Sequence, residues 1–340
     1  MNKKFFFFIF KHRYRKNIFN NFLNIKKIYN YRIYDLSGPY KYYLFSKILI
    51  YLVEKFHIFF QNFCLISCDG RPIIRKNGIN MWFGGTSHKI PANYKDLKNN
   101  CHVFENFIKK EENLIKLFPT KINFSPLNKK LKIIFIGSFT FSKYKIVNTI
   151  WKKEKNRIFK NYNIIEKKFF WKKYNLDKDK HVLSYYIGLK DLIRFHSIQK
   201  LNKKFKKDLL IVGNCWKPYI KSSLKSNHDL QYVKSLYASN ICIDFGSKWG
   251  SNSLYPRSVN IIESGGILLQ MKQTDSKTVY GKIAKDMSFN SFDDLTKKIN
   301  KLINFKKESN NLYLNQFKTF NNINLNYQAF KRISKISNKN

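Results

Sequence analysis

The sequence lacks the features that define a secreted or membrane-spanning protein. Its five cysteines include no Cys-x-x-Cys pair, which favours a reducing compartment and gives no sign of a structural metal site. The apolar run at residues 5–10 is too short for the core of a signal peptide. The longest apolar stretch, residues 47–60, is interrupted by charged side chains. We therefore expect a cytoplasmic protein without a transmembrane helix.

Acidic residues and arginine are also scarce. The chain has 21 Asp and Glu against 65 Lys and Arg, a formal net charge of +44, and only nine of the 65 are Arg. A basic surface is typical of nucleic-acid-binding proteins, but these favour Arg for its two-pronged contacts. The lysines are dispersed among Asn, Ile, Phe and Tyr, which share A/T-rich codons, so drift in base composition explains most of the charge. Nucleic-acid binding is the minor alternative, and attraction to an anionic membrane surface or substrate is the expected consequence.

The chain is long and apolar enough to fold as two domains. It has 340 residues, of which 44% are hydrophobic and 17% aromatic, enough for two separate cores. A basic, polar segment at residues 128–132 precedes a new buried strand, and we place the domain boundary there. We expect an N-terminal domain at residues 1–128, a C-terminal domain at 129–310 and a helical tail at 311–340 that packs back on the N-terminal domain.

Helical and strand-like segments alternate along both halves. In the first half, the pattern predicts a helix at residues 40–60 and a buried strand at 62–68. In the second half, it predicts strands at the apolar run after residue 132 and at residues 208–213, 241–246 and 267–271, and helices at residues 143–172, 190–206, 228–238 and 256–264 and from residue 293. Continuous apolar strands between helices are typical of a parallel sheet covered on both faces. The expected fold class is α/β, with two Rossmann-like domains facing each other across a cleft.

Glycines follow the predicted strands of the second half. Gly137-Ser138 comes after the first strand and Gly213 after the second. Ligands of open parallel sheets bind beyond the carboxyl ends of the strands, and glycine lets backbone N–H groups approach a pyrophosphate. A plain turn is the alternative at each position.

The segment LYPRSVNIIESGG, residues 254–266, holds the best group of candidate residues. Pro256 begins a helix and places Arg257 in its first turn, where the unpaired N–H groups attract an anion. Glu263 lies near the end of this helix, before Gly265, and its carboxylate can accept hydrogen bonds from ribose hydroxyls. An ordinary proline-started, glycine-capped helix with a solvated Glu is the alternative.

Residues 237–269 resemble the donor-site region of group 1 glycosyltransferases, in particular the branch related to spore-maturation proteins. The matching positions are Arg257, Glu263, Gly265 and Gly266, and the segment SFNSFDDLTKKINKLI is similar to the closing pattern of that family. The resemblance implies a GT-B fold and a hexosyltransferase that uses a nucleotide-sugar donor. It makes residues 1–128 the acceptor-binding domain and residues 129–310 the nucleotide-sugar-binding domain. The residues that it assigns to donor binding are Gly137, Ser138, Gly213, Tyr255, Arg257, Glu263 and Gly265. Tyr255 stands where many retaining members carry a Glu, which leaves the stereochemical outcome open.

The resemblance also implies catalysis without a metal or another cofactor. In such folds backbone amides and basic side chains stabilise the leaving nucleotide. Arg257 is the first candidate for this role, and Lys143 and Lys248 follow. The acceptor, a glycan, lipid or protein, needs a general base from the N-terminal domain, for which His88 is favoured over Asp69 and Glu105. A GT-B-like binding protein without activity is the alternative.

Overall fold

The computed structural model describes residues 5–10, 30–35, 63–68, 79–82, 100–102, 122–124, 126–127, 130–227, 229–246, 253–254 and 256–321. The chain divides into two compact units. One consists of Met1–Lys121 and Asn322–Asn340, and the other of Ile122–Asn321. The functions predicted for the two domains stay predictions, as does the cleft between them.

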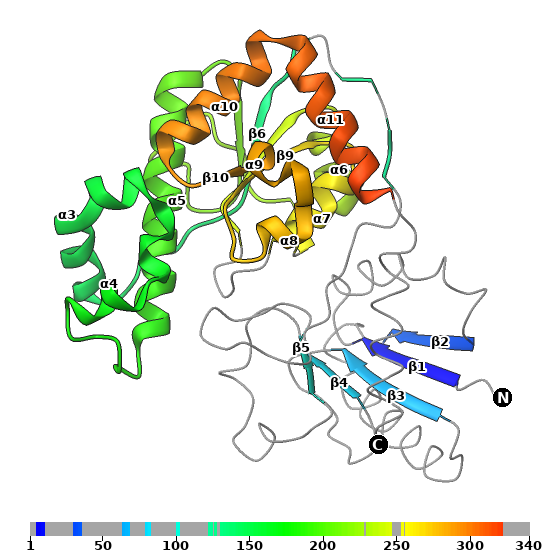
Figure 1. Ribbon diagram of the computed structural model, residues 1–340, viewed down its shortest axis with the longest axis horizontal. Coiled ribbons are helices and arrows are strands. Elements are labelled where there is room, and N and C mark those ends of the chain that lie inside the picture. The colour runs from blue at the N-terminus through cyan, green and yellow to red at the C-terminus, as the bar shows by residue number, and fades with distance from the viewer. Residues whose placement is uncertain are drawn as a thin grey trace. The chain divides into compact units, whose positions relative to one another are not determined.

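The first unit contains a five-stranded parallel sheet (Figure 1). Its strands are β1 (Phe5–Phe10), β2 (Asn30–Asp35), β3 (Phe63–Cys68), β4 (Ile79–Trp82) and β5 (Asn100–His102). They are arranged in the order β2-β1-β3-β4-β5, with Phe5 opposite both Asn30 and Phe63. The strand predicted at residues 62–68 is confirmed by β3. The helix predicted at residues 40–60 lies outside the described residues.

The second unit is built on another five-stranded parallel sheet (Figure 1). Its strands are β6 (Ile133–Ile136), β7 (Leu209–Val212), β8 (Ile241–Asp244), β9 (Ile267–Met271) and β10 (Ser288–Phe289). The order is β10-β9-β8-β6-β7, so the two sheets share one topology, in which the first strand lies between the second and the third. The first four strands confirm the sequence prediction, because side chains buried on both faces of a sheet form continuous apolar runs.

Helices surround this sheet (Figure 1). Their bounds are α3 (Lys145–Lys160), η5 (Tyr162–Glu166), α4 (Lys168–Lys172), α5 (Val182–Phe205), α6 (Leu230–Tyr237), α7 (Pro256–Glu263), α8 (Ser276–Tyr280), η6 (Gly281–Ile283), α9 (Ala284–Met287), α10 (Phe292–Asn304) and α11 (Lys306–Phe320). Helix α5 packs on β7 and α3, whereas α7 packs on β8 and β9 and contacts α6 and α11. None of the helices in the described part of the chain is long and apolar enough to cross a membrane.

Two predicted helices have different bounds in the structure. The single helix expected at residues 143–172 is broken at Asn161, which is extended and accepts a hydrogen bond from the Asn163 N–H at 3.1 Å through its side chain. Asn favours such local bonds over a continuing helix. The helix expected at residues 190–206 begins earlier, at Val182. Asp179 accepts the His181 N–H at 2.6 Å and so fixes the chain just before that start.

Candidate functional site

The candidate site lies where the strand order of the second sheet reverses, between β6 and β8. At such a switch point the loops after the two strands lead to different sides, and the space between them is the usual ligand site of this topology. Gly137 follows β6 and Gly246 lies just beyond β8, while Gly213 follows β7 beside β6. Three glycines therefore stand at one edge of the sheet.

The loops after β6 and β7 are in direct backbone contact. The Gly137 N–H donates to the Val212 carbonyl at 2.8 Å. A Cβ atom on Gly213 would lie only 2.3 Å from the Gly137 oxygen, so no larger residue fits there without a shift of the loops. The Ser138 Oγ accepts the Asn214 N–H at 2.8 Å. The structure thus brings together Gly137, Ser138 and Gly213, which the sequence assigned to one site.

An aromatic cluster packs against the loop that contains Gly137. The indole N–H of the fully buried Trp216 donates to the Gly137 carbonyl at 2.6 Å. Its ring packs edge-on against Phe135 and Phe139, with centroids 5.7 and 4.6 Å away. Buried rings with a satisfied polar atom hold a backbone segment in one position.

Arg257 faces the same loop from the first turn of α7. A Cβ atom on Gly137 would lie 3.3 Å from the Arg257 Nη2, so the guanidinium group lies against the glycine backbone. The Arg257 Nη1 is 3.3 Å from an oxygen of Asp244, which is fully buried at the end of β8. Asp244 in turn accepts the Gln270 amide at 2.9 Å and the Gly246 N–H at 3.1 Å. These bonds orient a partly exposed cation toward the Gly137 loop.

Arg194 of α5 is a further residue of this site, which the sequence did not single out. It is 2% exposed and donates to the Ser138 carbonyl at 3.0 Å and the Gly246 carbonyl at 3.5 Å. Its charge is paired with Asp191 at 3.3 Å. Arg194 therefore joins the loops that follow β6 and β8 across the switch point. The signal in the sequence was a charged pair three residues apart in the apolar first half of this helix.

Lys190 precedes this pair on α5 and is buried as well. Burial lowers the pKa of Lys190 to about 8, and the Arg194 charge adds to that effect, while Glu166 and Asp244 oppose it. The ammonium group lies 4.9 Å from the centre of the Tyr186 ring. Buried charges of both signs thus lie beside the site, and each acts more strongly there than in water.

Glu263 and Gly265 are not brought to this group. Helix α7 runs from the carboxyl end of β8 to the amino end of β9, so its last residue, Glu263, lies at the opposite edge of the sheet. Glu263 is 4% exposed, its carboxylate is 3.2 Å from the Lys234 Nζ, and its carbonyl accepts the Asn123 N–H at 2.9 Å. Gly265 has φ +74 and lies against the Asn123 carbonyl, as expected of a glycine that ends a helix.

The other predicted residues divide into those that the structure describes and those that it does not. His88, Tyr255 and Lys248 lie outside the described residues, and so do Asp69 and Glu105. Lys143 is exposed in the loop after β6, with its ammonium group 5.5 Å from the centre of the Tyr144 ring.

One Asp-x-Asp sequence, Asp177-Lys178-Asp179, bears on metal binding. In the structure Asp179 accepts the His181 N–H at 2.6 Å and the Tyr185 hydroxyl at 3.3 Å. Its carboxylate therefore holds the chain at the start of α5. Within the described ranges, no group of three or more His, Cys, Asp and Glu side chains is arranged to hold a metal ion.

Comparison with known proteins finds a likeness in structure but none in sequence. No protein-family model matches the sequence, and no curated protein matches it. Among solved structures, the chain is similar to T4 phage BGT in complex with UDP and Mn2+, with 12% identity and a TM-score of 0.47 over 98% of each chain. A likeness of this size carries no conclusion about function.

Proposed function

We propose that this chain is a GT-B glycosyltransferase that moves a hexose from a nucleoside-diphosphate sugar to a glycan, lipid or protein acceptor. The donor diphosphate binds at Gly137, Ser138, Gly213 and Arg257. The observation that carries this proposal is the Arg257 guanidinium group, held by Asp244 against Gly137 at the switch point of a parallel sheet. An arginine at a helix start beside a glycine loop is a favourable phosphate site.

The chemistry asked of these residues is stabilisation of the leaving nucleotide. Negative charge grows on the diphosphate as the sugar departs, and a preoriented cation lowers the energy of that state without reorganising. The Gly137 amide is already bonded to Val212, so phosphate binding rests on Arg257 and on the Ser138 hydroxyl. Ser138 accepts from Asn214 and keeps its own O–H for donation.

Two residues of the proposal lie outside the described ranges. His88 supplies the general base from the N-terminal domain, and Tyr255 contacts the donor sugar. The protein acts in the cytoplasm, held loosely at an anionic membrane surface by its charge. Donor binding needs no divalent ion, since Arg257 and the Ser138 hydroxyl take the place of a metal.

Calorimetry with UDP, GDP, uridine and guanosine tests the donor site. We expect Arg257→Ala to weaken the better-bound diphosphate by about tenfold or more and its nucleoside by less than twofold, since a charge-assisted bond to phosphate is worth about 1.5–3 kcal/mol. Arg157→Ala is the matched control, because Arg157 is half exposed on α3 and paired only loosely with Glu154 at 3.7 Å. An unchanged diphosphate affinity in Arg257→Ala contradicts the assignment, and loss of wild-type binding in EDTA contradicts metal independence.

A transfer assay then separates an enzyme from a binding protein. If the protein binds the donor but releases no free nucleotide, with or without an acceptor present, it is a binding protein without activity. Release that depends on Arg257 assigns the enzyme.

A further inference from the structure

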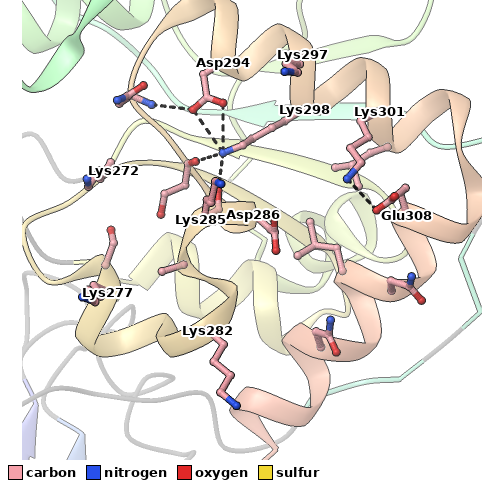
Figure 2. A pocket seen from close by; sticks show the side chains of 18 of the residues that line it. Lys272, Lys277, Lys282, Lys285, Asp286, Asp294, Lys297, Lys298, Lys301 and Glu308 are labelled. Carbon is pink, nitrogen blue, oxygen red and sulfur yellow. Dashed lines mark hydrogen bonds and ion pairs between the residues drawn. The ribbon is translucent and has the colours of Figure 1, made fainter.

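A large basic pocket lies elsewhere in the second unit. It has a volume of about 850 Å³ and is formed by the β9–α8 loop, α8, η6, α9, β10, α10 and α11. Seven of its lining residues are lysines and three are acidic. The lysines are Lys272, Lys277, Lys282, Lys285, Lys297, Lys298 and Lys301, and Figure 2 labels all of them. Gly137, Ser138, Gly213 and Arg257 are not among the described residues that line it.

Lys298 has a structural role in this pocket. Its ammonium group donates to the Lys285 carbonyl at 2.6 Å and to the Ser288 carbonyl, and it is 3.4 Å from the Asp294 carboxylate (Figure 2). Oxygen atoms from α9, β10 and α10 thus converge on one cation. Lys298 therefore fixes the backbone that carries the neighbouring lysines.

The remaining charges of the pocket do not balance. Asp294 is paired with Lys298, and Glu308 is 3.0 Å from Lys301. Asp286 is then the acidic side chain left to face Lys272, Lys277, Lys282, Lys285 and Lys297. No ion pair within the described part of the chain involves these five lysines. Gathering like charges around a concave surface raises its positive potential, and a bound anion relieves the repulsion.

The lining indicates which kind of anion fits. Among the described residues that form the pocket, none is aromatic, so it offers no platform on which nucleic-acid bases stack. Leu302 and Leu312 are buried, at 4% and 8% exposure, and give no apolar anchor for a lipid bilayer. Asn290, Asn311 and Asn315 add amide hydrogen-bond donors. Lysine is a point-charge phosphate binder that requires no fixed angle.

We propose that this pocket binds a compact, soluble molecule with several phosphate groups. The occupant is held by Lys277, Lys282 and Lys285 from α8, η6 and α9, together with Lys272 and Lys297. Gly281, with φ +55, makes the turn between α8 and η6 that presents Lys282, and a Cβ atom there would meet nothing within 4 Å. The site is separate from the proposed donor site and does not depend on it.

Calorimetric titration with inorganic tripolyphosphate tests this proposal. The protein carries Arg257→Ala throughout, so that the proposed donor site does not contribute. The pocket variant is Lys277→Gln with Lys282→Gln and Lys285→Gln. Its control, Lys152→Gln with Lys153→Gln and Lys155→Gln, removes the same charge from exposed positions of α3. We expect the pocket variant to weaken tripolyphosphate binding at least tenfold and the control less than twofold.

Two outcomes of the tripolyphosphate titration would overturn the proposal. Equal losses in the two variants, or no saturable binding before substitution, overturn the proposal, because the charge then acts without a site. Two further probes, a single-stranded oligodeoxynucleotide and phosphatidylserine vesicles, address the other phosphate sources. If the pocket variant loses affinity for either of them while its tripolyphosphate affinity is unchanged, the occupant is not a compact soluble anion. Since tripolyphosphate binding is measured without Arg257, failure here leaves the donor site untouched.

Discussion

At the scale of single residues, the contacts of Glu263 argue against the ribose binding that its position in the sequence predicts. Because its carboxylate is paired with Lys234 at the far edge of the sheet, we expect Glu263→Ala to leave UDP and GDP affinity within twofold. We expect the free energy of unfolding to fall by about 1 kcal/mol or less, as for a partly exposed ion pair. Lys234→Ala should cost more, about 1–3 kcal/mol, because it takes this cation from the buried Glu263 carboxylate, and a double-mutant cycle should show coupling of about 0.5–1 kcal/mol. A tenfold loss of nucleotide affinity in Glu263→Ala would restore the ribose contact predicted from the sequence.

At the scale of elements, α5 carries a titrating lysine in its buried stretch. Burial lowers the pKa of Lys190 from 10.5 to about 8, so between pH 8 and 10.5 the unfolded chain holds the proton that the folded protein has lost. Stability therefore rises with pH in that window, by up to about 1.4 kcal/mol per pH unit. The slope is about half of that at pH 8 and nearly zero below about pH 7. Glu166, Arg194 and Asp244 also affect this pKa, and a substitution of Lys190 leaves all three in place.

Lys190→Met isolates this contribution. We expect the unfolding free energy of the wild type, minus that of the variant, to rise by less than about 0.5 kcal/mol from pH 7 to 8 and by about 1–2 kcal/mol between pH 8 and 9.5 in urea titrations. The range stops below pH 10 because burial raises the pKa of Tyr186 well above its usual value, which lowers stability in more alkaline solution. A difference that stays flat to pH 9.5 would mean that water or a neighbouring anion keeps Lys190 charged.

The elements also show what sequence patterns predict and what they miss. Strands β6 to β9 were predicted because burial on both faces leaves an unbroken apolar run, and α7 because Pro256 and Gly265 mark its ends. The placing of Gly137 and Gly213 at one edge followed from the rule that parallel strands end together, and the family resemblance added Arg257 to them. Arg194 was missed because its partners Ser138 and Gly246 are 56 and 52 residues away. The pairing of Glu263 with Lys234 joins two helices, and no local pattern contains it.

At the scale of the whole molecule, a net charge of +44 on 340 residues makes stability depend on ionic strength. Like charges repel more in the compact state than in the expanded one, and the Debye length falls from about 30 Å at 0.01 M salt to about 8 Å at 0.15 M. We expect the melting temperature to rise by several degrees between 10 and 150 mM NaCl. Tetramethylammonium chloride should act equally, since the anion does the screening. A melting temperature that falls or stays constant would show that paired charges, such as Lys301 with Glu308, outweigh the repulsion of the excess lysines.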